Sequence, residues 1–246
     1  MVMTSAKPMR WLDPATQRWG LPDAFVGWLL VQVIGQVVAI GVLIATGHAS
    51  DATDDLPLEV VALLQVGLAF AFFIVPFVIT NRKGNGLVTD LGFQVRWGDL
   101  WRGGIIGALL QWPILVILYW PILELMGKSS SDLAEPARAL GDRADGLSGA
   151  VLLILIVGVM APIFEELFFR GLMQRAFLKR RFPPWAAIGV TALVFGASHG
   201  QWLQLPALVL AGAVFGWLAY RSGRLGPAIA AHVTFNMVTV LALLLG

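Results

Sequence analysis

The sequence predicts an all-α, polytopic transmembrane helical bundle, on the basis of a high apolar content, a low charge content and a succession of long apolar segments. Hydrophobic residues make up 58% of the chain and charged residues 13%, whereas a soluble domain has about 25% charged residues. A large soluble protein with buried helices would need more polar surface than this composition supplies. The expected environment is therefore a lipid bilayer.

Seven segments approach the roughly 20 mostly apolar residues that a helix needs to cross a bilayer. They cover residues 24–47, 57–80, 101–126, 147–169, 184–199, 203–220 and 226–245. The fifth and sixth segments are short, so about seven spans are expected and six to eight fit the pattern. The first segment is too long for the removable apolar region of a signal peptide, so we expect it to be a retained span.

Residues 127–146 form the longest polar connection, which predicts an extramembrane loop with a short helix near residues 133–140. The loop divides the chain into residues 1–146, which hold three spans and the loop, and residues 147–246, the expected catalytic core. Both parts belong to one membrane domain. The division reflects chemistry, because the first three predicted spans hold no ionisable residue at mid-depth and nearly all such residues follow residue 146.

The cations predict a cytoplasmic N-terminus. In that orientation fourteen of the 17 cations face the cytoplasm: Lys7, Arg10, Arg18, Arg82, Lys83, Arg96, Arg102, Arg170, Arg175, Lys179, Arg180, Arg181, Arg221 and Arg224. The other side carries Lys128, Arg138 and Arg143 beside Asp51, Asp54 and Asp55. The positive-inside rule favours this arrangement, and an odd number of spans then places Gly246 outside.

Two pairs of glycines predict places where helices pack closely. Gly103/Gly107 and Gly212/Gly216 have the G-x-x-x-G spacing that lets membrane helices approach closely. We expect them to pack helices within the chain, with a dimer contact as the alternative.

The absence of cysteine excludes disulfides and thiolate metal sites. Because the cations lie in short loops beside spans, the basic isoelectric point does not indicate a nucleic-acid partner.

Charged side chains inside a bilayer are costly and usually functional, and the first such group here is Glu165-Glu166-Leu-Phe-Phe-Arg170. Glu166 and Arg170 are four residues apart with the acid first, the favourable order for a helical ion pair. Glu165 lies about 100° around the helix, so it is free to exchange a proton. The alternative is a helix end at the membrane interface, with all three side chains solvated.

Two further groups place polar side chains at the same helical spacing. Phe195 and His199 share one helix face, and His232 and Asn236 share another. An imidazole and a carboxamide on one face can direct two donors at one oxygen, as an oxyanion site requires. The alternatives are a histidine that reaches the interface and ordinary hydrogen bonds between helices. The remaining histidine, His48, lies in a loop and has no expected role.

Together these motifs, in this order on successive membrane helices, resemble those of the CAAX protease and bacteriocin-processing family, also called the CPBP, Abi or type II CAAX prenyl endopeptidase-like family. The resemblance covers residue 147 to the C-terminus. It implies an intramembrane glutamic endopeptidase in which Glu165 and His199 activate a water. His232 and Asn236 would then stabilise the oxyanion, and Glu166 and Arg170 would form a supporting ion pair.

The resemblance also sets expectations for substrate, cofactor and location. The substrate would be membrane-associated: a CAAX-type prenyl protein, a bacteriocin leader or a regulatory protein. No cofactor is expected, and the partners are membrane lipid and a peptide or lipidated protein. A multi-pass protein of a bacterial plasma membrane fits the composition. The oligomeric state and the choice among these substrates are left open.

Other functions remain as alternatives. Glu165, His199 and His232 could bind a divalent metal with two imidazoles and one carboxylate, although the chain has no H-E-x-x-H motif. Ser198 lies in a G-x-S-x-G string that resembles a serine nucleophile, but that motif requires a strand–turn–helix setting. A proton-coupled transporter and a catalytically silent scaffold or immunity protein are the non-protease alternatives. Substitution of Glu165 separates a protease from a scaffold.

One difficulty concerns the distance between the first two motifs. The predicted spans place Glu165 near one end of its helix and His199 near the far end of the next. To share a water, the first helix must continue past Arg170, as far as about Arg181, or the helices must tilt or break. Gly171 and the pair of prolines at 183–184 are possible places for a break.

Overall fold

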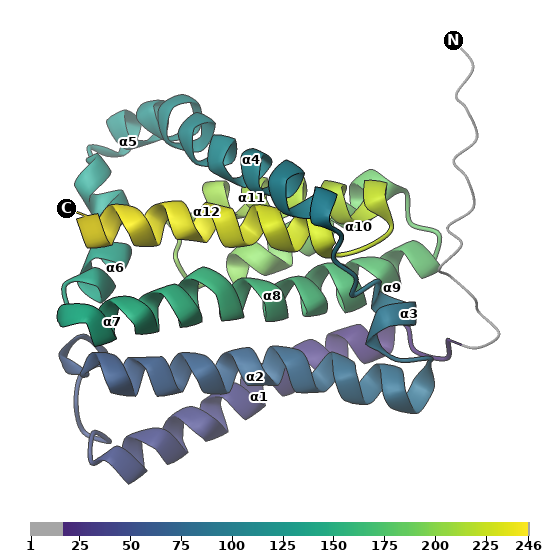
Figure 1. Ribbon diagram of the computed structural model, residues 1–246, viewed down its shortest axis with the longest axis horizontal. Coiled ribbons are helices and arrows are strands. Elements are labelled where there is room, and N and C mark those ends of the chain that lie inside the picture. The colour runs from purple at the N-terminus through teal and green to yellow at the C-terminus, as the bar shows by residue number, and fades with distance from the viewer. Residues whose placement is uncertain (1–16, 246) are drawn as a thin grey trace.

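The computed structural model describes residues 17–245, and every regular element in that range is a helix (Figure 1). The longer helices are α1 (Leu21–Thr46), α2 (Leu58–Lys83), α4 (Trp97–Pro113), α11 (Leu205–Ser222) and α12 (Gly226–Leu245). The shorter ones are η1 (Thr53–Asp55), α3 (Leu87–Leu91), η2 (Ile114–Tyr119), α5 (Trp120–Met126), α6 (Ser130–Gly141), α7 (Gly146–Leu153), η3 (Ile154–Met160), α8 (Ala161–Glu166), η4 (Leu167–Met173), α9 (Gln174–Lys179) and α10 (Pro184–Ala197). Lys7, Arg10 and Gly246, used in the predicted orientation, lie outside the described residues.

The predicted polytopic helical bundle is confirmed. Within residues 17–245, six helical segments are long and apolar enough to cross a membrane: α1, α2, α4 to α5, α7 to α9, α11 and α12. The fifth predicted span, at residues 184–199, is the 14-residue helix α10, which is apolar but shorter. The short helix predicted in the polar loop is α6.

The fourth span differs most from its prediction. Residues 147–169 were expected, but one 34-residue helix runs from Gly146 to Lys179 through α7, η3, α8, η4 and α9. Polar residues do not end it, because the structure gives them buried partners. Arg175, for example, donates to the carbonyl oxygens of Asp90 (2.9 Å) and Gly223 (2.8 Å).

The glycine pairs pack helices within the chain, as predicted. A Cβ added at Gly103 or Gly107 would overlap the backbone of α12 near Pro227 and Ala231. The missing side chains therefore let α4 lie directly against α12. A Cβ at Gly212 would lie 3.1 Å from the Phe195 ring, so this glycine brings α11 close to α10.

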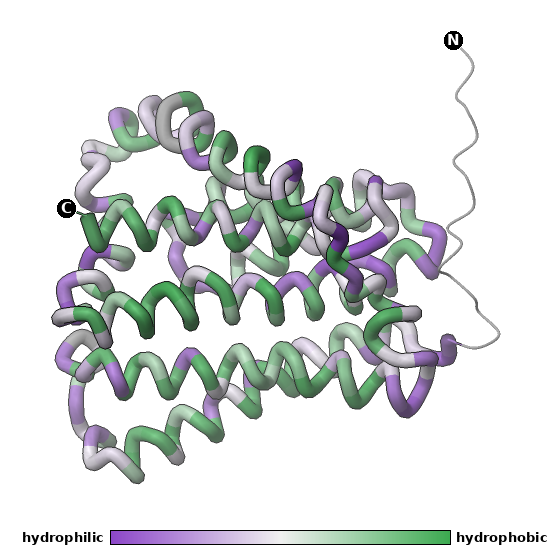
Figure 2. The backbone as a smooth tube through the Cα atoms, viewed as in Figure 1, coloured by the Kyte–Doolittle hydropathy of each residue, from purple (hydrophilic) through white to green (hydrophobic). Residues whose placement is uncertain are grey.

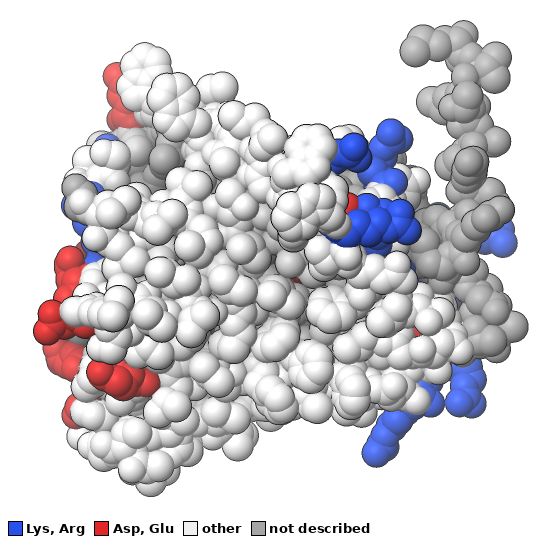
Figure 3. Space-filling view, in the orientation of Figure 1, with Lys and Arg blue, Asp and Glu red and all other residues white. Residues whose placement is uncertain are grey.

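The surface is divided as a bilayer would require (Figure 2). The outward faces of the long helices are apolar, and polar residues gather at the two ends. Figure 3 shows most of the visible Lys and Arg at one end and most of the visible Asp and Glu at the other, which also carries Lys128, Arg138 and Arg143. We call the first the cationic end, with Arg82, Lys83, Arg96, Arg102, Lys179, Arg180, Arg181, Arg221 and Arg224. The second is the anionic end, with Asp51, Asp55, Glu59, Glu124, Asp132, Glu135, Asp142 and Asp145.

A buried hydrogen-bond network closes the cationic end. The side chain of Asp90 in α3 is buried and accepts from Gln17 Nε2 (3.1 Å), Trp19 Nε1 (2.9 Å) and the Asn85 backbone N–H (2.9 Å). Arg175 reaches the Asp90 carbonyl from α9. Because such groups are costly to bury unless they are hydrogen-bonded, this network fixes α9 and the segment before α1 in place.

Candidate active site

The extra length of the fourth span brings the first two motifs together. A short turn at residues 180–183 joins α9 to α10, so the two helices run in opposite directions from the cationic end. Glu165 precedes Lys179 by 14 residues and His199 follows Pro184 by 15, which places both about 21 Å into the bundle at 1.5 Å per residue. The helix continues past Arg170, so the difficulty raised by the sequence disappears.

Glu166 is a structural carboxylate. Its side chain is 0% exposed. Its Oε1 atom accepts from Arg170 Nη1 at 2.7 Å and from His232 Nδ1 at 2.9 Å. The predicted ion pair of Glu166 and Arg170 is present, and it also holds an imidazole from α12.

Arg170 is held by groups from three helices. Its side chain is fully buried, and Nη2 donates to the Gly212 carbonyl of α11 at 3.0 Å. The guanidinium carbon lies 4.4 Å from the centre of the Phe195 ring and 5.6 Å from that of Phe215. A planar guanidinium suits such combined ionic, hydrogen-bonded and stacked contacts. Arg170 therefore joins the Glu166 helix to α10 and α11.

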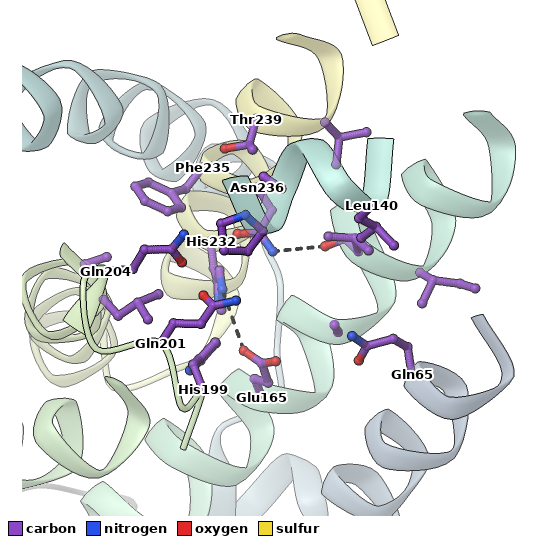
Figure 4. Close-up of a pocket in the computed structure, with 18 of the residues that line it drawn as sticks. Gln65, Leu140, Glu165, His199, Gln201, Gln204, His232, Phe235, Asn236 and Thr239 are labelled. Carbon is purple, nitrogen blue, oxygen red and sulfur yellow. Dashed lines mark hydrogen bonds and ion pairs between the residues drawn. The ribbon is translucent and has the colours of Figure 1, made fainter. Parts of the chain in front are cut away.

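Glu165 has different surroundings although it is the next residue. Its side chain is 18% exposed and lines a cavity. Its neighbour across the cavity is His232, whose Nε2 lies 3.8 Å from Glu165 Oε2. Figure 4 shows Glu165, His199 and His232 side by side at this cavity. Glu165 is thus the carboxylate of the pair that a water or a substrate can reach.

The two histidines present defined nitrogen atoms to the cavity. His199 Nδ1 lies 2.8 Å from the Phe195 carbonyl oxygen. Since a carbonyl only accepts, Nδ1 carries the hydrogen and Nε2 is left for the cavity. His232 stacks on Phe215, with ring centres 4.7 Å apart and an angle of 21°. With Nδ1 on Glu166, its Nε2 faces Glu165.

Asn236 lies one turn beyond His232 on α12 and lines the same cavity. Its Nδ2 donates to the Val157 carbonyl in η3 at 2.9 Å. A carboxamide has two N–H donors, so one donor holds the side chain in place and the second is available. The structure therefore brings together all four residues predicted to be catalytic.

The cavity has a volume of about 400 Å³ and takes residues from both halves of the chain. The contribution of the first half was not predicted from the sequence: Gln65, Leu68 and Phe72 of α2 line the cavity. Gln201 and Gln204, in the loop after α10, line it as well (Figure 4). A glutamine within an apolar span can indicate a polar residue that lines a cavity. Because glutamine is not ionisable, it is not among the charged residues that predicted the site.

The local helix geometry is unusual on both sides of the carboxylates. The segments η3 and η4 are π-helical and flank α8, which ends with Glu165 and Glu166. Wider π turns are rare and frequently occur at functional sites. Pro162, at the start of α8, cannot donate a backbone hydrogen bond, which gives a local reason for the departure from α-helical geometry.

The geometry also bears on two alternatives. Ser198 Oγ donates to the Val194 carbonyl at 2.7 Å and accepts from Trp28 Nε1 at 3.1 Å. Ser198 is the C-cap residue of α10 and does not lie in a strand–turn–helix elbow. The serine-nucleophile alternative therefore lacks its required setting. Among residues 17–245, no three His, Cys, Asp or Glu side chains are grouped so that they could hold a metal ion.

Comparisons with known proteins agree with these motifs. Residues 147–238 match the family described as "Type II CAAX prenyl endopeptidase Rce1-like". An Escherichia coli protein named "Uncharacterized 24.3 kDa protein" is 32% identical over 190 residues, covering 75% of this chain and 76% of that protein. The Bacillus subtilis (strain 168) protein named "Putative membrane peptidase YdiL" is 23% identical over 218 residues, covering 86% and 84%. No solved structure matches. The chain belongs to the type II CAAX prenyl endopeptidase Rce1-like family of membrane proteases.

Proposed function

We propose that this protein is an intramembrane endopeptidase in which Glu165 activates a water to hydrolyse a peptide bond of a membrane-associated substrate. The contrast between the two adjacent carboxylates supports this most strongly. Glu166 is bound by Arg170 and His232, whereas Glu165 is open to the cavity. A general base must be within hydrogen-bond reach of the proton that it takes, and Glu165 meets this condition for a water in the cavity.

The reaction follows from the positions of the four side chains. A water between Glu165 and His199 loses a proton to the Glu165 carboxylate as its oxygen attacks the substrate carbonyl carbon. Negative charge then develops on the carbonyl oxygen. The second N–H of Asn236 and the Nε2 side of the His232 ring are the groups that would face it. When the C–N bond breaks, Glu165 returns the proton to the leaving amine, so protons and charge balance.

Glu166 and Arg170 act as positioning residues in this proposal. Glu166 accepts the Nδ1 hydrogen of His232, and this bond directs Nε2 towards the reaction. Arg170 neutralises the buried carboxylate and ties it to α11 through the Gly212 carbonyl. Hydrogen bonds of this supporting kind orient the reacting groups before the substrate arrives. We propose no metal and no other cofactor.

We also propose in which membrane the protein lies and on which side its N-terminus is. The chain would be a multi-pass protein of a bacterial plasma membrane with its N-terminus in the cytoplasm. The separation of a cationic end from an anionic end supports this orientation, because cytoplasmic loops carry an excess of Lys and Arg.

The test is cleavage of a panel of quenched-fluorescent peptides, prenylated and unprenylated, by the purified protein in detergent. Wild type is compared with Glu165→Gln, Ser198→Ala and, as a matched control, Glu59→Gln at the exposed start of α2. Each protein is assayed with and without a strong chelator. We expect cleavage that Glu165→Gln abolishes and that the other two variants and the chelator leave intact.

Other results would contradict the proposal in distinct ways. Activity that the chelator removes would indicate a metal-dependent protease. Loss with Ser198→Ala but not with Glu165→Gln would indicate a serine nucleophile. A folded wild-type protein that cleaves no peptide of the panel would support the scaffold alternative instead.

A further inference from the structure

The cavity extends from the reacting groups mainly towards one end of the bundle, and towards the other end it reaches only about one helical turn, to Phe169 and Phe195. On α12 its lining runs from His232 to Leu243, away from the helix start at the cationic end. On α2 it runs from Gln65 to Phe72, from the half that starts at the anionic end to just past the middle of the helix. Residues of α7 and η3, on the same side of Glu165, complete the wall. The cavity therefore lies between the proposed catalytic groups and the anionic end.

The opposite direction is closed. Glu166 and Arg170 fill the space directly behind Glu165, and both side chains are 0% exposed. Phe168, Leu172 and Met173 of η4 are also fully buried, and the Asp90 network lies beyond them. No lining residue comes from α3 or α9. Water and substrate thus have no route to Glu165 from the cationic end.

Helix α6 lies at the anionic end, beside α7 and the end of α12 (Figure 1). Pro136, Ala137 and Leu140 line the cavity from this helix, and Pro136 is also exposed. Gln204 Nε2 donates to the Leu133 carbonyl at 2.8 Å, which joins α6 to the loop after α10. A short polar helix therefore borders the cavity at the anionic end.

The cavity wall suits an apolar peptide in an extended form. Most of the wall is apolar, and it includes Leu68 and Phe72. The side-chain amides of Gln65 and Gln201 also face the cavity and have no hydrogen-bond partner within residues 17–245. A peptide bond can be cut only when its helix is unwound, and unwound backbone in a membrane needs replacement hydrogen bonds. These two amides can supply them.

We infer that the substrate is an apolar segment of an exported or membrane-spanning peptide, which enters from the non-cytoplasmic side beneath α6. The cationic end faces the cytoplasm under the positive-inside rule, so the cavity opens away from it. The prenylated C-terminus of a cytosolic protein would arrive at the closed end. That the bound peptide is a substrate rests on the proposed function. The side from which the cavity is reached does not depend on activity.

Because the chain contains no cysteine, single cysteines can report access without further substitutions. Gln65→Cys reports on the cavity, and Val66→Cys, the next residue on the outer face of α2, is its control at the same depth. Glu135→Cys on α6 and Arg82→Cys at the opposite end mark the two ends. Intact cells are treated with a charged, membrane-impermeant thiosulfonate before and after permeabilisation.

We expect Gln65→Cys and Glu135→Cys to react in intact cells, Arg82→Cys to react only after permeabilisation, and Val66→Cys to stay unmodified. Reaction of Gln65→Cys only from the side of Arg82→Cys would overturn the inference, and so would its lack of reaction from either side. Reaction of Arg82→Cys in intact cells would reverse the orientation and overturn the inference as well.

The substrate class is tested by protection in the Gln65→Cys/Glu165→Gln protein, which binds without cutting. The probes are a Leu- and Ala-rich peptide and the same peptide with a farnesylated C-terminal cysteine. At about ten times its Kd, the unmodified peptide should slow modification roughly tenfold. Better protection by the farnesylated peptide would overturn the substrate class. If the access pattern holds but wild type cuts no peptide, the proposed function fails and the side of access stands.

Discussion

At the scale of single residues, two neighbouring carboxylates differ because their partners come from distant parts of the chain. Glu166 binds Arg170, four residues away, and His232, 66 residues away. Glu165 faces the cavity. The sequence predicted that Glu166 would pair with Arg170 and that Glu165 need not share that partner, and the structure agrees. The spacing could not show which histidine would bind Glu166, because that contact depends on how α12 packs.

This contrast predicts that the two acids differ in their effect on stability. Glu166→Gln leaves Arg170 buried without its counter-ion, and breaking a buried pair typically costs about 3–5 kcal/mol. Glu165→Gln removes no pair within hydrogen-bond distance and should change the free energy of unfolding little. Thermal unfolding of both variants in detergent measures the difference. Equal midpoints for the two variants would contradict the assigned roles.

At the scale of elements, the site depends on how closely helices approach. Helix α12 carries His232 and Asn236, and it lies against the glycines of α4. The sequence predicted this close packing from the glycine spacing. It left open whether the fourth span would continue to about Arg181 or whether the helices would tilt or break, because Arg170 and Arg175 resemble helix ends until their partners are known. Those partners, Gly212 and Gly223, are 42 and 48 residues away.

Gly107→Ala should displace α12 and the side chains on it that we propose to be catalytic. A Cβ at Gly107 would overlap the Ala231 carbonyl, one residue from His232, whereas a Cβ at Gly41 on α1 would meet nothing within 4 Å. We expect Gly107→Ala to lower both the unfolding midpoint and peptide cleavage. The control Gly41→Ala should keep activity and gain up to about 1 kcal/mol of stability from helix propensity. Two variants that behave alike would refute the close contact.

The N-terminus of α6 should respond to pH. Asp132 accepts hydrogen bonds from the backbone N–H of Ser129 and from the Ser129 hydroxyl. These bonds, the backbone bond most strongly, lower the pKa of Asp132. A lowered pKa means that the stabilisation is present above the unfolded value of about 3.9 and is lost as pH falls through the folded value. Hydrogen exchange of α6, corrected for intrinsic rates, should therefore be constant near neutrality and faster in acid.

Ser129→Ala is the matching variant, because the Ser129 hydroxyl also accepts from the Asp132 backbone N–H. Loss of a serine N-cap should speed the exchange of α6 amides roughly fivefold at neutral pH. It should also weaken the acid response, since one of the bonds to Asp132 is gone. An unchanged exchange rate in this variant would show that the cap does not hold α6 over the cavity.

At the scale of the whole molecule, the sequence predicted the environment and the helical bundle better than it predicted the cavity. Apolar length and the positions of the cations follow directly from the order of residues. The cavity does not, because α2, α6 and α12 meet only in the folded chain. Gln65 illustrates this limit: its role depends on facing Asn236 and Glu165 across the cavity (Figure 4). The hairpin of α10 and α11 was likewise expected to form two short spans, and α10 is shorter than the helices that could cross a membrane.

The two charged ends predict the sidedness of the whole chain. With the cationic end in the cytoplasm, α12 runs outward from Gly226 to Leu245. Alkaline phosphatase fused after the last residue should therefore be active in intact bacteria, and a fusion within the turn before α10 should be inactive. The reverse pattern would place the anionic end in the cytoplasm.

The most direct test of the central claim is the kcat/KM of Glu165→Gln on the best peptide of the panel, measured beside Glu59→Gln in the presence of a chelator. Loss of a general base typically lowers the rate by about 10²–10⁴-fold. We expect a loss of at least this order for Glu165→Gln with an unfolding midpoint close to that of wild type, and no loss for Glu59→Gln. A folded Glu165→Gln protein that retains wild-type kcat/KM would contradict hydrolysis by a water that Glu165 activates.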